Sequence, residues 1–201
     1  MHLWQGQVRP EAYAAYWRNH WTALSTAEVN AASGRICYGS EETEALCQDA
    51  IKALDLRLTD LLLDIGCAKG LMKDHLVRHV AAYIGLDYIA AFNPGIVGDA
   101  LELPFRNCSF DKVLLSGVLV CIPPEWHHRT LAEIHRVTRF GGRAFVSHNP
   151  CQRIHDMACV FDRQELMQLA RRCGWASTKI VPINPILEQA SCYFDMVLYR
   201  D

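Results

Sequence analysis

The most constraining feature of this sequence is a short apolar run that ends in a glycine-rich loop. Leu61-Leu62-Leu63-Asp64-Ile65 is followed directly by Gly66-Cys67-Ala68-Lys69-Gly70. An apolar run of this length, ending at a glycine, predicts a β-strand buried on both faces, as in a parallel sheet. The two glycines let the backbone turn tightly and approach a ligand closely, and the loop opens onto the start of a helix. Alone, such a loop only weakly indicates nucleotide binding, because glycine turns after strands often serve packing.

Strand-like and helix-like segments alternate along the rest of the chain. Six further strands are expected, at 82–86, 96–97, 112–119, 143–147, 176–183 and 193–199. Helices are expected at 10–24, 41–53, 71–80, 130–138 and 162–173, and Gly141-Gly142 is expected to turn the chain. This alternation predicts a parallel sheet with helices on both faces. The last two strands are joined by a link too short for a helical crossover, so they should pair antiparallel.

Polar residues stand at the ends of three later strands. Ligands of open parallel α/β sheets bind beyond these carboxyl ends. Asp87 ends the second strand, where an acid can accept both hydroxyls of a ribose, and the adjacent Tyr88 can lie along an adenine face. Asp99 and Ala100 follow the third strand, where a carboxylate can take an adenine amino group, and Ser116 lies at the end of the fourth. With the glycine loop, these ends predict one nucleotide-type cofactor site.

Residues 58–147 resemble the core of the class I S-adenosylmethionine-dependent methyltransferases, in particular the small-molecule branch typified by quinone-biosynthesis methyltransferases. The resemblance is carried by the loop at 62–70, by 98–105 with 109–113, and by Glu133-Ile134-His135-Arg136-Val137-Thr138-Arg139-Phe140-Gly141-Gly142. It implies an α/β fold: a Rossmann-like, doubly wound, seven-stranded sheet, mostly parallel with an antiparallel C-terminal strand and helices on both faces. The length of 201 residues fits one domain over 1–201, with an N-terminal segment at 1–40 and the cofactor-binding core at 41–201.

The resemblance also implies the cofactor and the roles of the strand-end residues. The donor would be S-adenosyl-L-methionine, the product S-adenosyl-L-homocysteine, and the acceptor a small molecule methylated by in-line displacement. Asp87 would bind the ribose, Asp99 the adenine amino group, and Ser116 would lie near the sulfonium by its backbone. Asp64 would orient the methionine end of the cofactor through the loop. The cradle for that end would be formed by Gly66, Cys67, Ala68 and Gly70.

The sequence departs from the family's pattern in places that concern the acceptor. Cys121 stands where this branch often carries a histidine, so the role of that histidine cannot be transferred. Ala68 replaces a glycine and Phe140 replaces a proline, both mild changes. A general base is needed only if the acceptor must lose a proton. His148, just past the fifth strand, is the leading candidate base, followed by His127 or His128 in the expected loop after the fourth strand; each also fits a solvated loop histidine.

Two further segments have competing interpretations. Zinc-type ligands recur at spacings of three, four and four, at His148, Cys151, His155 and Cys159. Metal sites usually show tighter or paired spacings, so we expect no metal there and an active-site lining segment instead. Residues 1–40 hold three of the five tryptophans, Trp4, Trp17 and Trp21. They are expected to form an aromatic lid over the acceptor, the alternative being a helix packed on the sheet.

Composition excludes several other classes of protein. A net charge of −2, with basic residues in ones and twos, argues against nucleic acid as a partner. No stretch approaches the ~18 apolar residues of a membrane span. Nine scattered cysteines without a C-x-x-C pair, and a start that does not resemble a signal peptide, predict a cytoplasmic protein with reduced thiols. The oligomeric state is not indicated.

Three classes of function are compatible with these features. A small-molecule methyltransferase is favoured. A nicotinamide-dependent oxidoreductase shares the strand–glycine–helix–acid pattern, although the segments at 98–99 and 103–105 and the antiparallel last strands disfavour it. The third is a family member that binds cofactor or a partner without catalysis, which Cys121 and the lack of an assured base suggest.

Overall fold

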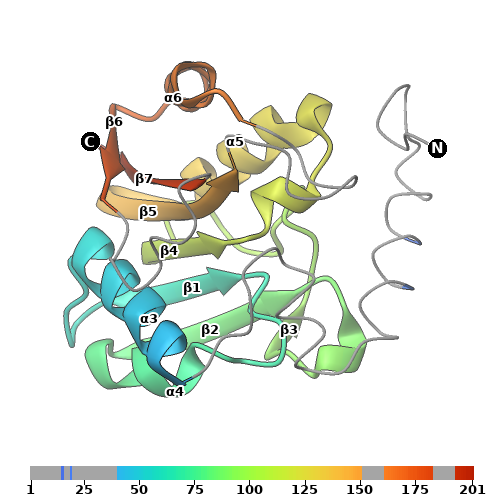
Figure 1. Cartoon of the computed structure of the whole chain (residues 1–201), viewed down its shortest axis with the longest axis vertical. Coiled ribbons are helices and arrows are strands. Elements are labelled where there is room, and N and C mark those ends of the chain that lie inside the picture. Colours follow the sequence, from blue (N-terminus) through green and yellow to red (C-terminus); the bar gives the residue numbers. More distant parts are fainter. Residues whose placement is uncertain (1–14, 16–18, 20–39, 151–160, 183–192) are drawn as a thin grey trace.

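A seven-stranded mixed sheet forms the centre of the molecule (Figure 1). The computed structural model describes residues 40–150, 161–182 and 193–201, together with residues 15 and 19. Its strands lie in the order β3-β2-β1-β4-β5-β7-β6. Their bounds are β1 Leu61–Ile65, β2 Ala82–Asp87, β3 Ile96–Val97, β4 Phe110–Ser116, β5 Thr138–Pro150, β6 Ser177–Val181 and β7 Tyr193–Tyr199. The predicted number of strands is confirmed.

The strand directions also agree with the prediction. Strands β1 to β5 pair in parallel, whereas β7 pairs antiparallel with both β5 and β6. Because β1 lies between β2 and β4, the loops that follow these three strands are neighbours at one edge of the sheet. The tertiary structure therefore places the residues of the predicted site side by side.

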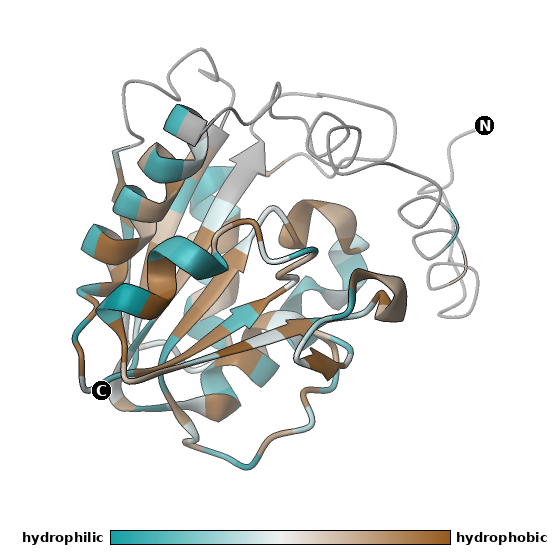
Figure 2. Ribbon diagram, turned by 90° about the horizontal axis from the view of Figure 1, so that it is seen from below, coloured by the Kyte–Doolittle hydropathy of each residue, from teal (hydrophilic) through white to brown (hydrophobic). Residues whose placement is uncertain are grey.

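Helices cover both faces of the sheet, and each face has its own apolar core. On one face, α3 (Ser40–Leu54) and α4 (Lys73–Leu76) pack on Leu62, Leu114 and Phe145. On the other, α5 (His127–Val137) and α6 (Arg163–Arg172) pack on alternate residues of the same strands, including Leu63, Val113 and Val146. Figure 2 shows the apolar colour concentrated along the strands and the polar colour on the outer sides of the helices. The inward residues alternate because successive side chains of a strand point to opposite faces.

Several predicted boundaries were wrong. The expected helix at 71–80 is only one short α-helix followed by a 3₁₀ turn at Val77–His79. The fourth strand ends at Ser116, and Leu119–Cys121 is a 3₁₀ turn instead of strand. Gly141-Gly142 does not end a helix–strand connection but lies inside β5, where the pairing with β4 shifts register between Phe110 and Lys112. The extra residues of β5 form a bulge there, which a positive φ of +73° at Gly141 permits.

Other elements match more closely. Asp162 caps α6 as predicted, because its side chain accepts the backbone N–H groups of Gln164 and Glu165. The expected helix at 10–24, and with it the proposed aromatic lid, lies outside the described residues apart from Ala15 and Asn19. No helix in the described part of the chain is long and apolar enough to cross a membrane.

Candidate functional site

The loop after β1 has a conformation that demands small residues. Gly66, Ala68 and Gly70 all have positive φ angles, of +74°, +48° and +78°. The N–H groups of Gly66 and Cys67 both donate to the carbonyl of Leu86 on β2, at 2.7 and 3.1 Å. A Cβ on Gly66 would lie 2.1 Å from the Cγ2 of Val118, so only glycine lets the loops after β1 and β4 approach this closely. The predicted glycine loop therefore forms as a tight turn at the carboxyl edge of the sheet.

Asp87 joins the loop after β1 to the loop after β2. Its Oδ2 accepts the N–H of Ala68, and its Oδ1 accepts the N–H of Ile89, both at 2.8 Å. The side chain is buried, and this burial raises the pKa of the carboxyl, although the backbone N–H groups of Ile89 and Ala68 oppose the rise. The residue chosen from the sequence as the ribose acid thus stands at the centre of the strand-end loops.

Asp64 has a partner that the sequence did not reveal. The Oη of Tyr83, on β2, donates to Asp64 Oδ2 at 2.6 Å. Asp64 is 4% exposed, and burial raises its pKa to about 6 against the opposing hydrogen bond from Tyr83. The negative charge of Asp87 adds to the rise. A tyrosine four residues before an acidic strand end carries no recognisable sequence signal, because the contact depends on the pairing of β1 with β2.

The cysteine in the loop is poorly suited to act as a nucleophile. Burial is the main reason that the pKa of Cys67 is raised to about 12, with Asp64 and Asp87 contributing. A thiol with this pKa is protonated at neutral pH and is therefore unreactive. Cys67 contributes to the loop through its backbone and its packing beneath Gly85, whose Cβ position lies 2.9 Å from the Cys67 sulfur.

The loop after β3 presents Asp99 and Ala100 close to Asp87. The N–H of Gly98 donates to the carbonyl of Asp87 at 2.9 Å, which fixes the two loops together. Asp99 Oδ1 accepts the N–H of Leu101 at 2.8 Å, while Ala100 is buried. Tyr88 is half-buried beside Asp87. The predicted adenine-side residues are therefore neighbours along these two loops.

The end of β4 is open on one side. Ser116 Oγ accepts a hydrogen bond from the Oγ of Ser147 on β5 at 2.8 Å, and the two residues are paired in register. Gly117 follows with a φ of +68°, and no atom of the described residues lies within 4 Å of the position that a Cβ would occupy there. Cys121 contacts the carbonyl of Gly117 through its sulfur at 3.6 Å. Among the described residues, Gly117 therefore has room for a further atom, at the same edge of the sheet as the glycine loop.

The candidate bases differ in how the structure places them. His148 belongs to β5, one residue after Ser147, and the structure does not describe its side chain. His127 was expected in a loop, but it is the first residue of α5 and its ring is buried. Its Nε2 lies 2.7 Å from the carbonyl of Ile122, and its ring stacks on Phe161 with centroids 5.0 Å apart. These contacts stabilise the start of α5. The role of His127 as a base stays a prediction. His128 is exposed.

The suggested zinc cluster is not tested by the structure. Its residues at 151, 155 and 159 lie outside the described residues. Within the described ranges, no three side chains of the metal-binding types come together.

Sequence comparison now identifies this architecture. Residues 63–146 match the family model described as a methyltransferase domain. These residues form a methyltransferase domain. This match favours a methyltransferase over the nicotinamide-dependent oxidoreductase that the same strand–glycine–acid pattern allowed.

Curated relatives of the domain act on different molecules. The demethylmenaquinone methyltransferase of Thermobifida fusca is 29% identical over 143 residues, which cover 64% of this chain and 55% of that protein. The phthiotriol/phenolphthiotriol dimycocerosates methyltransferase of Mycobacterium leprae is 34% identical over 126 residues, covering 55% of this chain and 46% of that protein. The chain therefore spans about half the length of the curated relatives it matches.

A solved structure shares the fold over nearly the whole chain. It is the 1,6-didemethyltoxoflavin-N1-methyltransferase of Burkholderia thailandensis, determined with bound 1,6-didemethyltoxoflavin and S-adenosylhomocysteine. The TM-score is 0.72 at 18% identity, with coverage of 98% of this chain and 92% of that chain. At this identity, the similarity concerns the Rossmann-like methyltransferase fold alone, and it confirms the predicted fold class.

Proposed function

We propose that this chain transfers the methyl group of S-adenosylmethionine to a small-molecule acceptor and releases S-adenosylhomocysteine. The observation that carries the proposal is the buried Asp87 carboxylate, which holds the glycine loop through Ala68 inside the domain matched by the family model. The relatives support a small acceptor, since one is named for demethylmenaquinone and the Burkholderia enzyme binds 1,6-didemethyltoxoflavin.

The residues at the strand ends fit this cofactor chemically. A carboxylate has about four acceptor positions, so Asp87 can hold the two loops and still accept a ribose hydroxyl. In the proposed arrangement, Asp99 accepts the adenine amino group, Tyr88 lies along the adenine, and Ala100 packs beside it. The cradle for the methionine part consists of Gly66, Cys67, Ala68 and Gly70. The open position at Gly117 leaves room for the sulfonium end beside Ser116.

The chain's own contribution to catalysis is then mainly positioning. When bound, the cofactor supplies an electrophilic methyl group on a sulfonium. The hydrogen bond from Tyr83 ties the Asp64 side chain of β1 to β2, and the hydrogen bond from Ser147 to Ser116 links β5 to the end of β4. Holding two reactants in line contributes about 7–11 kcal/mol in favourable cases. If the acceptor must lose a proton, we propose His148 as its base, because it follows Ser147 at the end of β5.

A cytoplasmic location is part of the proposal. The five cysteines whose side chains the structure describes are all free, which suits a reducing compartment.

Calorimetric titration with S-adenosylhomocysteine and, separately, NADH tests the cofactor assignment. We expect binding of the first and none of the second; the reverse result would remove the proposed function. Asp87→Asn should weaken S-adenosylhomocysteine binding by about a hundredfold, since charge-assisted hydrogen bonds to the ribose are lost. Asp55→Asn is the matched control, because Asp55 precedes β1 at the opposite edge of the sheet and pairs with Arg57 and Arg143.

Turnover separates an enzyme from a binding protein of the same fold. Mass spectrometry of molecules that co-purify with the chain would supply acceptors for an assay of S-adenosylhomocysteine release. Methylation of such a small molecule supports the proposal, whereas cofactor binding without turnover on any of them supports the non-catalytic alternative. His148→Gln should reduce turnover without weakening cofactor binding, and unchanged turnover would remove His148 as the base.

A further inference from the structure

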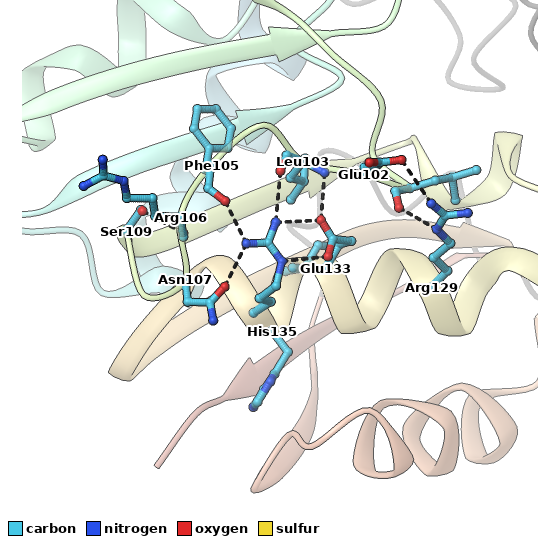
Figure 3. Close-up of polar contacts among 12 residues, drawn as sticks. Glu102, Leu103, Phe105, Arg106, Asn107, Ser109, Arg129, Glu133 and His135 are labelled. Atoms are coloured by element: carbon cyan, nitrogen blue, oxygen red, sulfur yellow. Dashed lines mark hydrogen bonds and ion pairs between the residues drawn. The ribbon is translucent and has the colours of Figure 1, made fainter.

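A row of charged residues on α5 faces residues 101–107, a segment between β3 and β4 that belongs to neither strand. Arg129, Glu133 and Arg136 are spaced four and three residues apart, so they share one face of the helix. The buried residues Leu131, Ile134 and Val137 occupy the opposite side. Figure 3 shows the polar row reaching the backbone of residues 101–107, while His135 points away from it. The row therefore acts outside its own helix.

The contacts engage the segment at alternate residues. Arg129 Nε donates to the carbonyl of Leu101 at 2.8 Å. Glu133 Oε2 accepts the N–H of Leu103 at 2.8 Å, and Arg136 Nη2 donates to the Leu103 carbonyl at 2.9 Å. Arg136 Nη1 donates to the Phe105 carbonyl at 2.7 Å and to Asn107 Oδ1 at 3.0 Å. Backbone groups that would be shared between strands in a sheet are here satisfied by side chains of one helix.

Glu133 and Arg136 are locked to each other as well. Arg136 Nε donates to Glu133 Oε1 and its Nη2 to Glu133 Oε2, both at 2.7 Å. This pairing lowers the pKa of Glu133 and raises that of Arg136, so both stay charged. A guanidinium presents its donors in a fixed planar fork, which matches a carboxylate and several carbonyls together; an ammonium cannot do so. The pair thus holds residues 103–107 in one arrangement.

This segment begins two residues after Asp99, the acid proposed to bind the adenine end of the cofactor. Leu101, whose carbonyl Arg129 holds, donates its N–H to Asp99 Oδ1 at 2.8 Å. Asp99 and Glu102 also form an isolated β-bridge. Movement of residues 101–107 would therefore change the orientation of the Asp99 carboxylate, which lies two residues before them.

We propose that Glu133 and Arg136 are positioning residues that order residues 101–107 and thereby orient Asp99 for the adenine end of the cofactor. This inference rests on the proposed function, because it assigns Asp99 to that cofactor. Neither Glu133 nor Arg136 touches the cofactor; they act through the backbone of the segment between α5 and Asp99.

Arg136→Lys tests the proposal against Arg143→Lys. Both arginine side chains are 30% exposed and form an ion pair, but Arg143 pairs with Asp55 at the opposite edge of the sheet. Hydrogen exchange of the free proteins should show faster exchange in residues 100–107 for Arg136→Lys only. The Kd of S-adenosylhomocysteine for the folded protein should rise about tenfold, which corresponds to one lost charge-assisted hydrogen bond.

A purely structural role would give a different result. Arg136→Lys would then lower the melting temperature while the Kd and the exchange of residues 100–107 stayed as in wild type, and the proposal would be overturned. If Arg136→Lys does not fold, Glu133→Gln makes the same test, since it retains an oxygen for Leu103 but loses the charged pair. Its Kd should also rise, and an unchanged Kd with unchanged exchange refutes the positioning role.

The two proposals fail in distinguishable ways. If wild type does not bind S-adenosylhomocysteine, the proposed function fails and the orientation of Asp99 for that cofactor falls with it. If wild type binds and the Arg136→Lys and Glu133→Gln variants bind equally well, only the positioning role is overturned. An increase in the KM for S-adenosylmethionine, with kcat at saturating cofactor unchanged, is the expected kinetic result in an active preparation.

Discussion

The Oη of Tyr83, near the start of β2, donates a 2.6 Å hydrogen bond to Oδ2 of the buried Asp64, near the end of β1. Asp64 lies on β1, two residues before the glycine loop at 66–70, and Tyr83 lies on β2, the strand that ends at Asp87. The pair therefore joins the two strands whose loops carry the proposed methionine and ribose contacts. Burial raises the pKa of Asp64 to about 6, and the hydrogen bond from Tyr83 opposes this rise.

Asp64→Asn should reduce the pH dependence of stability. The folded pKa of Asp64, about 6, is above its unfolded value, so the folded state binds the proton more tightly. This contribution is fully present below the unfolded pKa of about 4 and is lost as pH rises through the folded pKa. Relative to wild type, Asp64→Asn should gain about 2 kcal/mol of unfolding free energy between pH 4 and pH 7. Urea denaturation at both pH values measures it, and a constant difference would contradict the buried-acid interpretation.

Tyr83→Phe should raise the pKa of Asp64 further. The Tyr83 hydrogen bond opposes the effect of burial on Asp64, so its removal should raise the pKa of Asp64 above 6. Carboxyl carbon NMR of the folded protein follows this titration directly. A pKa that stays the same or falls would show that the hydroxyl does not stabilise the carboxylate.

Gly66→Ala and Gly117→Ala form a matched pair of substitutions. Both glycines have a left-handed φ, but only the new Cβ at position 66 meets another atom, Val118 Cγ2 at 2.1 Å. Gly117→Ala should cost about 1 kcal/mol for its backbone conformation, and Gly66→Ala about 3 kcal/mol because the clash is added. Thermal unfolding without ligand measures both. Adding Val118→Ala should restore part of the Gly66→Ala loss, and no recovery would exclude the contact as its cause.

Lys112→Met should destabilise the chain through the end of α3. Lys112 is buried in β4, donates to the carbonyl of Leu54 at 2.7 Å and lies 3.9 Å from Asp60. Burial lowers its pKa, although Asp60 opposes this. Removing the ammonium takes a hydrogen-bond donor from the Leu54 carbonyl and a positive charge from beside the Asp60 carboxylate. We expect the free energy of unfolding to fall by about 2 kcal/mol. Lys179→Met, at an exposed position of β6, is the control in chemical denaturation, and an equal loss in both variants would argue against this role.

His127→Gln should make the protein less sensitive to mild acid. Burial lowers the pKa of His127, so the unfolded chain takes up the proton first. Stability from this group is present above the unfolded pKa of about 6.5 and is lost as pH falls through the folded pKa. Melting temperatures at pH 7 and pH 5 should therefore differ less in His127→Gln than in wild type. His79→Gln changes an exposed histidine and should behave as wild type.

Much of the fold could be predicted from local patterns. The apolar runs at β1, β4 and β7 are long enough and bounded clearly enough to be recognised one by one, and Asp162 caps α6 with the side chain the sequence suggested. The candidate site residues Asp64, Asp87, Asp99 and Ser116 were chosen because each stands at or near a predicted strand end, a property of local sequence. The predicted strand and helix boundaries were wrong where the pairing of strands overrides local preference, as in the bulge of β5 around Gly141.

The order of strands and helices, the glycine loop and the family of the domain were determined by the sequence itself, since they depend on residue type at short spacing. Only the tertiary structure decided which distant groups meet. Tyr83 reaches Asp64, Arg136 reaches the carbonyls of residues 103 and 105, and His127 is buried against Phe161 instead of lying in a loop. These contacts arise from strand register and helix packing, where each partner's position is set by the whole core and not by its neighbours in the chain.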